Sequence, residues 1–113
     1  MERDPLLTGQ IDLLLLALVA RGPLHGYAII EQLRRSSRGS FDLPEGTVYP
    51  ALYRLERLGL LKSDPQRFSG RTRRTYRVTR AGLATLRHRT VAWRELVRSM
   101  ESVLRGGSVS EHA

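Results

Sequence analysis

The chain of 113 residues contains no cysteine, few aromatic residues and no long apolar run. Without cysteine there is neither a disulfide framework nor a thiolate metal site, which favours a reducing compartment. The longest unbroken apolar run, residues 13–20, has eight residues, whereas a membrane span needs roughly 20. The first residues lack the basic-then-apolar order of a signal peptide. We therefore expect a small cytoplasmic protein that does not enter a membrane.

The basic residues are concentrated in one short segment. The net charge of the chain is +8. Residues 62–80 carry seven basic side chains against Asp64 alone, a net charge of +6, whereas residues 1–31 are net acidic. A focused basic excess attracts phosphate backbones or anionic membrane surfaces. The alternative is a strongly solvated surface, but the clustering favours a polyanionic partner.

Two helices are predicted in the first third of the chain. Thr8 is the expected N-cap of an almost continuously apolar helix over residues 11–19, which Arg21-Gly22-Pro23 ends. Its composition indicates burial on most sides. A second helix is expected to begin near His25-Gly26. Residues 36–40 then have the composition of a loop.

A third helix is predicted around Pro50. Proline lacks an N–H, so it suits a first helical turn and places the helix start near Gly46 or Thr47, with Thr47 the better cap. Gly59 is expected to end the helix. One face is apolar, with Val48, Leu52, Leu55 and Leu58. The opposite face is aromatic and basic, with Tyr49, Pro50, Tyr53, Arg54 and Arg57. An ordinary surface helix would carry more Glu and Lys and fewer Tyr.

A β-hairpin and a long helix complete the predicted elements. Residues 60–78 predict two short strands with a basic tip, in which Asp64-Pro65 and Gly70 are turn residues. Thr79 is the expected N-cap of a helix over residues 80–105. Residues 106–113 are expected to form a disordered tail.

The long helix carries a seam typical of a coiled coil. Its members are spaced three and four residues apart, with one polar insert: Leu83, Leu86, Thr90, Trp93, Val97, Met100 and Leu104. At 1.5 Å per residue the helix is about 39 Å long, more than so small a body can cover. This seam and the unusually apolar first helix predict a two-fold symmetric homodimer.

Three helices followed by a basic hairpin predict an α+β, mainly α, winged helix-turn-helix. Residues 1–79 would form the DNA-binding domain and residues 80–105 the dimerisation helix. Such a domain places the second helix of its helix-turn-helix in the major groove of double-stranded DNA, and its wing flanks this helix. Two-fold symmetry further predicts an inverted-repeat operator.

The expected DNA contacts lie on the third helix and at the wing tip. Arg54 is the candidate for a bidentate guanine contact, while Thr47, Tyr49, Pro50 and Tyr53 face bases or phosphates. Gly70, Arg71, Arg73 and Arg74 suit phosphates or the minor groove. The alternative for the two tyrosines is packing inside the domain, and for the wing arginines plain solvation.

Several motifs resemble the PadR family of bacterial regulators in their order and spacing. They are Leu24-His-Gly-Tyr27, Gly46-Thr-Val-Tyr-Pro-Ala-Leu-Tyr53, Arg54-Leu-Glu-Arg-Leu-Gly-Leu60, Gly70-Arg71, Tyr76-Arg-Val-Thr79 and Gly82. The resemblance covers nearly the whole chain and fits the short form with a single C-terminal helix. It implies a dimeric winged-helix repressor whose last helix packs partly on the partner's first helix. It also implies release by small phenolic or drug-like effectors.

Two isolated residues are open to different interpretations. His25 is either a phosphate contact, a metal ligand or a helix-start residue that satisfies backbone groups. Without a second ligand nearby we expect the structural role, no metal and no cofactor. Trp93 is either a hydrophobic anchor of the dimer interface or, with Leu96 and Met100, a platform for an aromatic effector.

Other functional classes fit the sequence less well. There is no phosphate-binding glycine loop and no catalytic triad or placed carboxylate pair, so we expect no enzyme. A winged helix that binds only proteins is the remaining alternative, because the fold alone does not decide function. It would present an acidic or apolar third helix and a short neutral wing, and this chain has neither.

Overall fold

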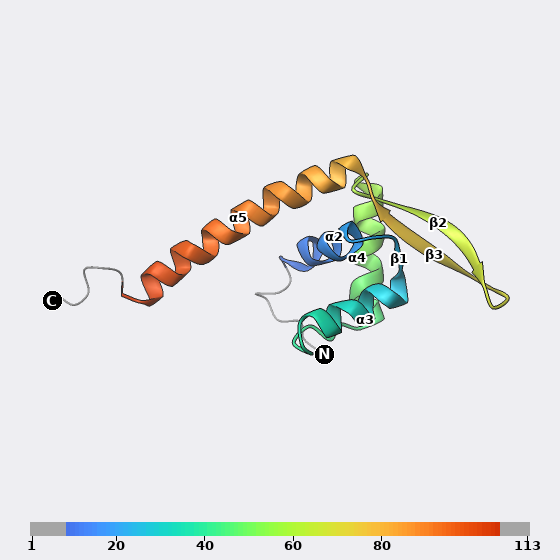
Figure 1. Cartoon of the computed structure of the whole chain (residues 1–113), viewed down its shortest axis with the longest axis horizontal. Helices are drawn as coiled ribbons and strands as arrows, with labels where there is room; N and C mark the ends of the chain where they lie inside the picture. The colour runs from blue at the N-terminus through green and yellow to red at the C-terminus, as the bar shows by residue number, and fades with distance from the viewer. Residues whose placement is uncertain (1–8, 107–113) are drawn as a thin grey trace.

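The computed structural model describes residues 9–106. Figure 1 shows a group of short helices that cross one another, a β-hairpin on one side and a long helix leading away. The elements in order are α2 (Ile11–Ala20), β1 (Leu24–His25), α3 (Gly26–Ser36), α4 (Glu45–Arg57), β2 (Leu61–Phe68), β3 (Arg71–Val78) and α5 (Arg80–Leu104). This is the predicted winged helix-turn-helix with a long C-terminal helix. The expected Thr8 cap and the tail beyond Gly106 lie outside the described residues.

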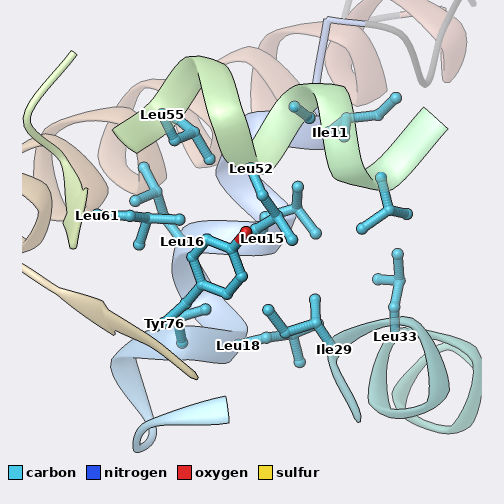
Figure 2. Packing of buried hydrophobic residues seen from close by; sticks show 13 residues of the cluster. Ile11, Leu15, Leu16, Leu18, Ile29, Leu33, Leu52, Leu55, Leu61 and Tyr76 are labelled. Atoms are coloured by element: carbon cyan, nitrogen blue, oxygen red, sulfur yellow. The ribbon is translucent and has the colours of Figure 1, made fainter. Parts of the chain in front are cut away.

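Helix α2 lies at the centre of the hydrophobic core. It packs against α3, α4, α5 and β3, and for this reason nearly all its faces are apolar, as predicted. Its N-cap is Gln10, whose side chain makes no capping bond. Figure 2 shows how side chains from α3, α4, β2 and β3 meet around it. The core consists of Ile11, Leu15, Leu16, Leu18, Val19, Ile29, Leu33, Val48, Ala51, Leu52, Leu55, Leu61 and Tyr76.

Helix α3 begins immediately after a short strand that the sequence did not predict. Nδ1 of His25 accepts the amide N–H of Ala28 at 3.3 Å and caps the helix. The predicted structural role of His25 is thereby confirmed. In β1, Leu24 lies opposite Tyr76 and His25 opposite Thr75, which gives a three-stranded antiparallel sheet of order β1-β3-β2. A two-residue strand has no periodicity that a sequence pattern can reveal.

Helix α4 begins earlier than predicted. Pro44 is the N-cap, and its carbonyl accepts the amides of Thr47 and Val48 at 3.0 and 3.1 Å. Thr47 therefore lies inside the first turn, and the prediction that it caps the helix is wrong. Pro50 falls in the second turn, where the missing N–H leaves the Gly46 carbonyl without its usual helical partner.

The end of α4 agrees with the sequence except for one side chain. Gly59 has φ +78°, and the Leu60 amide bonds to the Leu55 carbonyl at 3.0 Å, which closes the helix as expected for a C-terminal glycine. Leu58, predicted on the apolar face, is 61% exposed. It is the C-cap residue and lies beyond Leu55, the last residue of α4 that the core buries.

The wing is longer than predicted, with two strands of eight residues. Asp64 and Pro65 are not turn residues but lie within β2, opposite Thr75 and Arg74. Pro65 is tolerated because β2 is an edge strand of the sheet. The turn is Ser69-Gly70, and both residues have positive φ (52° and 77°), as a two-residue hairpin turn requires. Gly70 was therefore correctly predicted.

Helix α5 leaves the body after its first turns (Figure 1). Oγ1 of Thr79 accepts the Gly82 amide at 3.0 Å, which confirms the predicted cap. Leu86, predicted in the dimer seam, is half-buried and packs against the core of its own subunit. Farther along, Trp93, Met100 and Leu104 are 41%, 53% and 78% exposed. Within one subunit this part of the seam is thus largely uncovered.

Candidate nucleic-acid interface

The outward face of α4 is aromatic and basic, as the sequence predicted. Tyr53 is 63% exposed, and Tyr49 is 38% exposed at the edge of this face. The guanidinium of Arg57 lies over the Tyr53 ring, 5.5 Å from its centroid, in cation–π geometry. Tyr53 therefore stays at the surface, whereas Tyr49 leans on α3 beside Gly26. The packing alternative holds in part for Tyr49 and does not hold for Tyr53.

Arg54 lies on a different flank of α4 from Tyr49. Its guanidinium forms an ion pair with the carboxylate of Asp12 in the first turn of α2. The side chain of Arg54 remains 48% exposed and that of Asp12 only 20% exposed. Arg54 therefore still faces solvent, but its orientation is set by a residue 42 positions earlier in the chain. Sequence reasoning did not single out Asp12.

The arginines of the wing differ in how they are held. The guanidinium of Arg73 stacks on the Phe68 ring, 3.8 Å from its centroid, and its Nε is buried without a hydrogen-bond partner among the described residues. Arg77 pairs with Asp64 across the strands. No ion pair joins Arg71 or Arg73 to a carboxylate within residues 9–106. Two of the predicted DNA contacts thus carry an unneutralised charge.

Arg74 belongs to a hydrogen-bond chain at the base of the wing. Its Nε donates to Oγ of Ser63 at 2.9 Å, and the Ser63 hydroxyl donates to Glu56 Oε2 at 2.7 Å. Ser63 is buried. The chain joins β3 to β2 and to α4, so Arg74 helps to fix the wing against the helix. The sequence placed Arg74 at the wing tip with its neighbours, but this anchoring depends on tertiary contacts.

A cleft of about 560 Å³, here called the wing cleft, lies between the wing and the starts of α3 and α4. It brings together residues that the sequence places far apart: His25, Gly26, Tyr27, Tyr49, Phe68, Arg71, Thr72, Arg73, Arg74 and Tyr76. Within the part of the chain that the structure describes, no carboxylate lines it. Three arginines and four aromatic rings around one hollow suit a polyanion with flat or anionic groups. Tyr27 and Phe68 were not predicted, although Tyr27 stands in the Leu24–Tyr27 motif.

Burial sets the protonation of the groups in the wing cleft. It raises the pKa of Tyr49, with Glu45 contributing less, and it raises the pKa of Tyr76, followed by the nearby charge of Glu56. Both phenols therefore stay neutral near pH 7, so their hydroxyls remain hydrogen-bond donors. Burial also lowers the pKa of His25, and the positive charge of Arg73 adds to this. The neutral imidazole can then keep accepting the Ala28 amide.

A second hollow, here called the α2–α5 groove, has a volume of about 740 Å³. Its lining is mostly apolar: Gln10, Leu13, Leu14, Ala17, Phe41, Thr90, Trp93, Arg94, Val97 and Arg98. Trp93 and Val97, both predicted at the dimer interface, lie in it, while Leu96 borders a smaller adjoining hollow of about 210 Å³. Leu14 and Phe41 also pack against the core.

Two further findings bear on other classes of site. No helix of residues 9–106 is long and apolar enough to span a membrane. In the same part of the chain, no three His, Asp or Glu side chains are grouped so that they could hold a metal ion.

A winged helix with a basic wing and one long C-terminal helix has clear counterparts among known proteins. The model of the transcriptional regulator PadR-like family matches residues 15–88, which span α2 through the first turns of α5. The chain belongs to the PadR family. The resemblance carried by the sequence motifs is thus confirmed, and this PadR-family protein is a transcriptional regulator, not an enzyme.

Several known regulators are similar to this PadR-family chain in sequence, in fold or in both. Transcriptional regulator Rv3488 of Mycobacterium tuberculosis is 41% identical over 81 residues, which cover 72% of this chain and 73% of the relative. A PadR-family regulator from Clostridium difficile is 35% identical, with a TM-score of 0.75 over 85% of this chain and 99% of that one. A PadR-family regulator from Eggerthella lenta is 31% identical, with a TM-score of 0.79 over 88% and 85%. Regulators of this family bind DNA as transcription factors.

Proposed function

We propose that this PadR-family protein is a homodimeric repressor that binds an inverted-repeat operator and is released by an aromatic effector. The observation that carries the proposal is the wing cleft, which is lined by three arginines, four aromatic side chains and, among the described residues, no carboxylate. Beside it lies the exposed face of α4 with Tyr53 and Arg57. Such a surface matches the negative charge and the groove dimensions of duplex DNA.

The DNA contacts divide into anchoring and reading. Arg71 and Arg73, which have no carboxylate partner within the described residues, bind phosphates at or near the turn that Gly70 forms. Arg54 reads a base, because its guanidinium is exposed on α4 and its N–H donors match the acceptors on the major-groove edge of guanine. The remaining contacts are Thr47, Tyr49, Pro50 and Tyr53 from α4 and Arg74 from the wing.

The α2–α5 groove is the dimer interface, and its occupant is α5 of a second copy. The groove is mostly apolar, and the seam residues Trp93, Met100 and Leu104 are exposed in a single subunit. A seam of this spacing packs well against a partner helix. In the two-fold dimer, each α5 covers the other subunit's α2, and the two copies of α4 face successive turns of DNA.

The effector site lies where the dimer seam meets the groove. Trp93 offers a flat ring, Leu96 and Met100 are exposed beside it, and Arg94 lines the same groove. An aromatic molecule with an anionic or phenolic head group would fit these side chains. It releases DNA only if it prefers the dimer geometry that does not bind DNA.

These roles assign the two parts of the chain different functions. Residues 1–79 form the DNA-binding domain and residues 80–105 the dimerisation helix. The protein acts in the cytoplasm, where its operator is located.

Selection of DNA from a random-sequence library by the wild-type protein tests the central claim. We expect an enriched inverted repeat with half-sites about one helical turn apart. An electrophoretic shift should then separate this duplex from a scrambled duplex of the same composition. Failure to enrich any duplex would contradict DNA reading by this protein.

The effector claim needs a separate measurement. Aromatic acids and cationic dyes are titrated while Trp93 fluorescence is followed, because the chain contains no other tryptophan. Saturable quenching together with weaker binding to the selected duplex supports the site. A compound that releases DNA but leaves Trp93 emission unchanged, and still acts on Trp93→Ala, would place the effector elsewhere.

A further inference from the structure

Among the described residues, one ion pair joins two different helices. It connects Asp12 in the first turn of α2 with Arg54 on α4. The other ion pairs lie within α3, within the hairpin or within α5: Glu31–Arg34, Glu31–Arg35, Asp64–Arg77 and Glu101–Arg105. Asp12 therefore acts on the DNA-facing helix from outside it.

Asp12 is a well-fixed anchor. Its neighbour Ile11 is buried with 2% exposure, which holds the backbone of the turn against the core. Three residues before Asp12, the Gly9 carbonyl accepts a hydrogen bond from Arg89 of α5 at 3.3 Å. Because the turn is held from both sides, the Asp12 carboxylate has a defined position relative to α4.

Among residues 9–106, the ion pair occupies one edge of the Arg54 guanidinium and no other hydrogen bond or ion pair engages it. The bond runs from Nη2 of Arg54 to Oδ1 of Asp12. A guanidinium has five N–H donors in a rigid planar fork, so the remaining donors stay available for an external acceptor. Arg54 is 48% exposed, more than twice the 20% of Asp12. The carboxylate thus holds the guanidinium without facing the solvent side itself.

We propose that Asp12 is a positioning residue for DNA reading: it orients the Arg54 guanidinium so that its free donors face a base edge. Asp12 itself does not touch DNA. A free arginine side chain samples many rotamers, and pinning one edge before binding reduces what must be ordered on contact. The inference rests on the proposed role of Arg54 as the base-reading residue.

A double-mutant cycle tests the proposal on the full-length protein. Fluorescence anisotropy gives the Kd for the selected inverted-repeat duplex and for its scrambled counterpart, and the ratio of the two measures discrimination. Asp12→Asn should lower this ratio by roughly three- to tenfold, as expected for directly coupled residues. Asp12→Glu should keep most of it. In an Arg54→Ala background, Asp12→Asn should have no further effect on the ratio.

Asp64→Asn is the matched control. It also removes one carboxylate from a partly exposed ion pair with an arginine and raises the net charge by the same amount. Its effect should be equal on both duplexes, so that discrimination stays at the wild-type value. Thermal melting followed by circular dichroism checks folding of each variant. Asp12→Ser, which also suits a helix start, provides a second carboxylate-free variant.

The outcomes separate this inference from the proposed function. An unchanged ratio in Asp12→Asn, or an equal drop with and without Arg54, would overturn the positioning role. If Asp12→Asn lowers the affinity for both duplexes equally and also lowers the Tm, the ion pair has only a structural role. That result would also overturn the positioning role. If the wild type distinguishes the two duplexes and Arg54→Ala does so equally well, Arg54 does not read a base. The inference about Asp12 is then wrong as well. If the wild type shows no discrimination, DNA reading itself is contradicted.

Discussion

The ring of Tyr49 packs directly on the backbone of Gly26. A Cβ atom added at Gly26 would lie 2.9 Å from both Cζ and the hydroxyl oxygen of Tyr49, and closer still to Cε1. Real Cβ atoms do not approach other heavy atoms so closely. The contact brings the start of α3 against α4, the two helices of the helix-turn-helix, and it forms one wall of the wing cleft. Glycine at position 26 therefore sets how closely these helices approach.

Gly26→Ala should destabilise the domain through this contact. The added methyl group forces the Tyr49 ring to move, at a cost of about 1–3 kcal/mol, of which the better helix propensity of alanine offsets a part. Urea unfolding measures the change in the free energy of unfolding. Tyr49→Ala in the same chain should relieve the clash, so the double variant should lose less than the sum of the single losses.

Gly46→Ala provides the control for helical glycine. No heavy atom lies within 4 Å of a Cβ added there, so alanine should be neutral or slightly stabilising. Equal destabilisation by both glycine substitutions would show that the Tyr49 contact is not the cause.

Salt dependence distinguishes the wing arginines. Arg71→Ala should weaken binding to selected and scrambled duplexes alike and reduce the slope of log K against log salt, because a phosphate contact that releases counterions is lost. With one such contact per subunit, the slope of the dimer should fall by about two. Arg77 is already neutralised by Asp64, so Arg77→Ala should change the slope much less. A slope equal to that of the wild type in Arg71→Ala would exclude a phosphate contact by Arg71.

The lowered pKa of His25 predicts that the folded protein loses stability in mild acid. Its pKa in the folded protein is lowered from the ordinary 6.5, first by burial and then by Arg73. The unfolded chain therefore binds a proton before the folded one does, and stability should fall as the pH drops below about 6.5 toward the lower folded value. Urea unfolding at pH 7.5 and 5.5 measures this loss.

His25→Asn isolates the contribution of this imidazole. Asparagine is a good N-cap and does not titrate, so it should keep the start of α3 while removing that part of the pH dependence. The same difference between the two pH values in wild type and variant would assign it to other groups.

The assembly is tested by placing a charge in the α2–α5 groove. Val97 is half-buried in this groove, and Val97→Asp should dissociate the dimer because an unpaired carboxylate is costly in an apolar interface. Val91 lies on the same helix but does not line the groove and is 57% exposed, so Val91→Asp should remain dimeric. Sedimentation velocity at micromolar concentration distinguishes the two states. A folded wild-type monomer at that concentration would refute the obligate dimer.

Features governed by neighbouring residues were predictable from the sequence. Thr79 caps α5 through an amide three residues later, and Gly59 and Gly70 adopt the positive φ values that end a helix and turn a hairpin. The order of three helices and a wing followed from such local signals together with hydrophobic periodicity. Even so, Thr47 was misplaced as a cap, because the N-cap is Pro44, three residues earlier than the position of Pro50 suggested.

The candidate site was predictable as a set of residues but not as an arrangement. The exposed face of α4 and the arginines of the wing were identified because their charge and aromatic content depart from those of an ordinary surface. Tyr27, Phe68 and Asp12 were missed. Tyr27 and Phe68 gain their role where the wing meets the start of α3, and Asp12 gains its role from a contact with Arg54, 42 residues farther along the chain.

The sequence by itself thus determined the order of the helices and the wing, several of the helix ends and the family. Only the tertiary structure decided that β1 pairs with β3, that Pro65 lies in an edge strand, that Tyr49 packs on Gly26 and that Asp12 holds Arg54. Capping and turn formation involve atoms a few bonds apart along the chain, so they can be inferred from adjacent residues. Strand pairing and ion pairs between helices depend on where the hydrophobic core brings distant segments together.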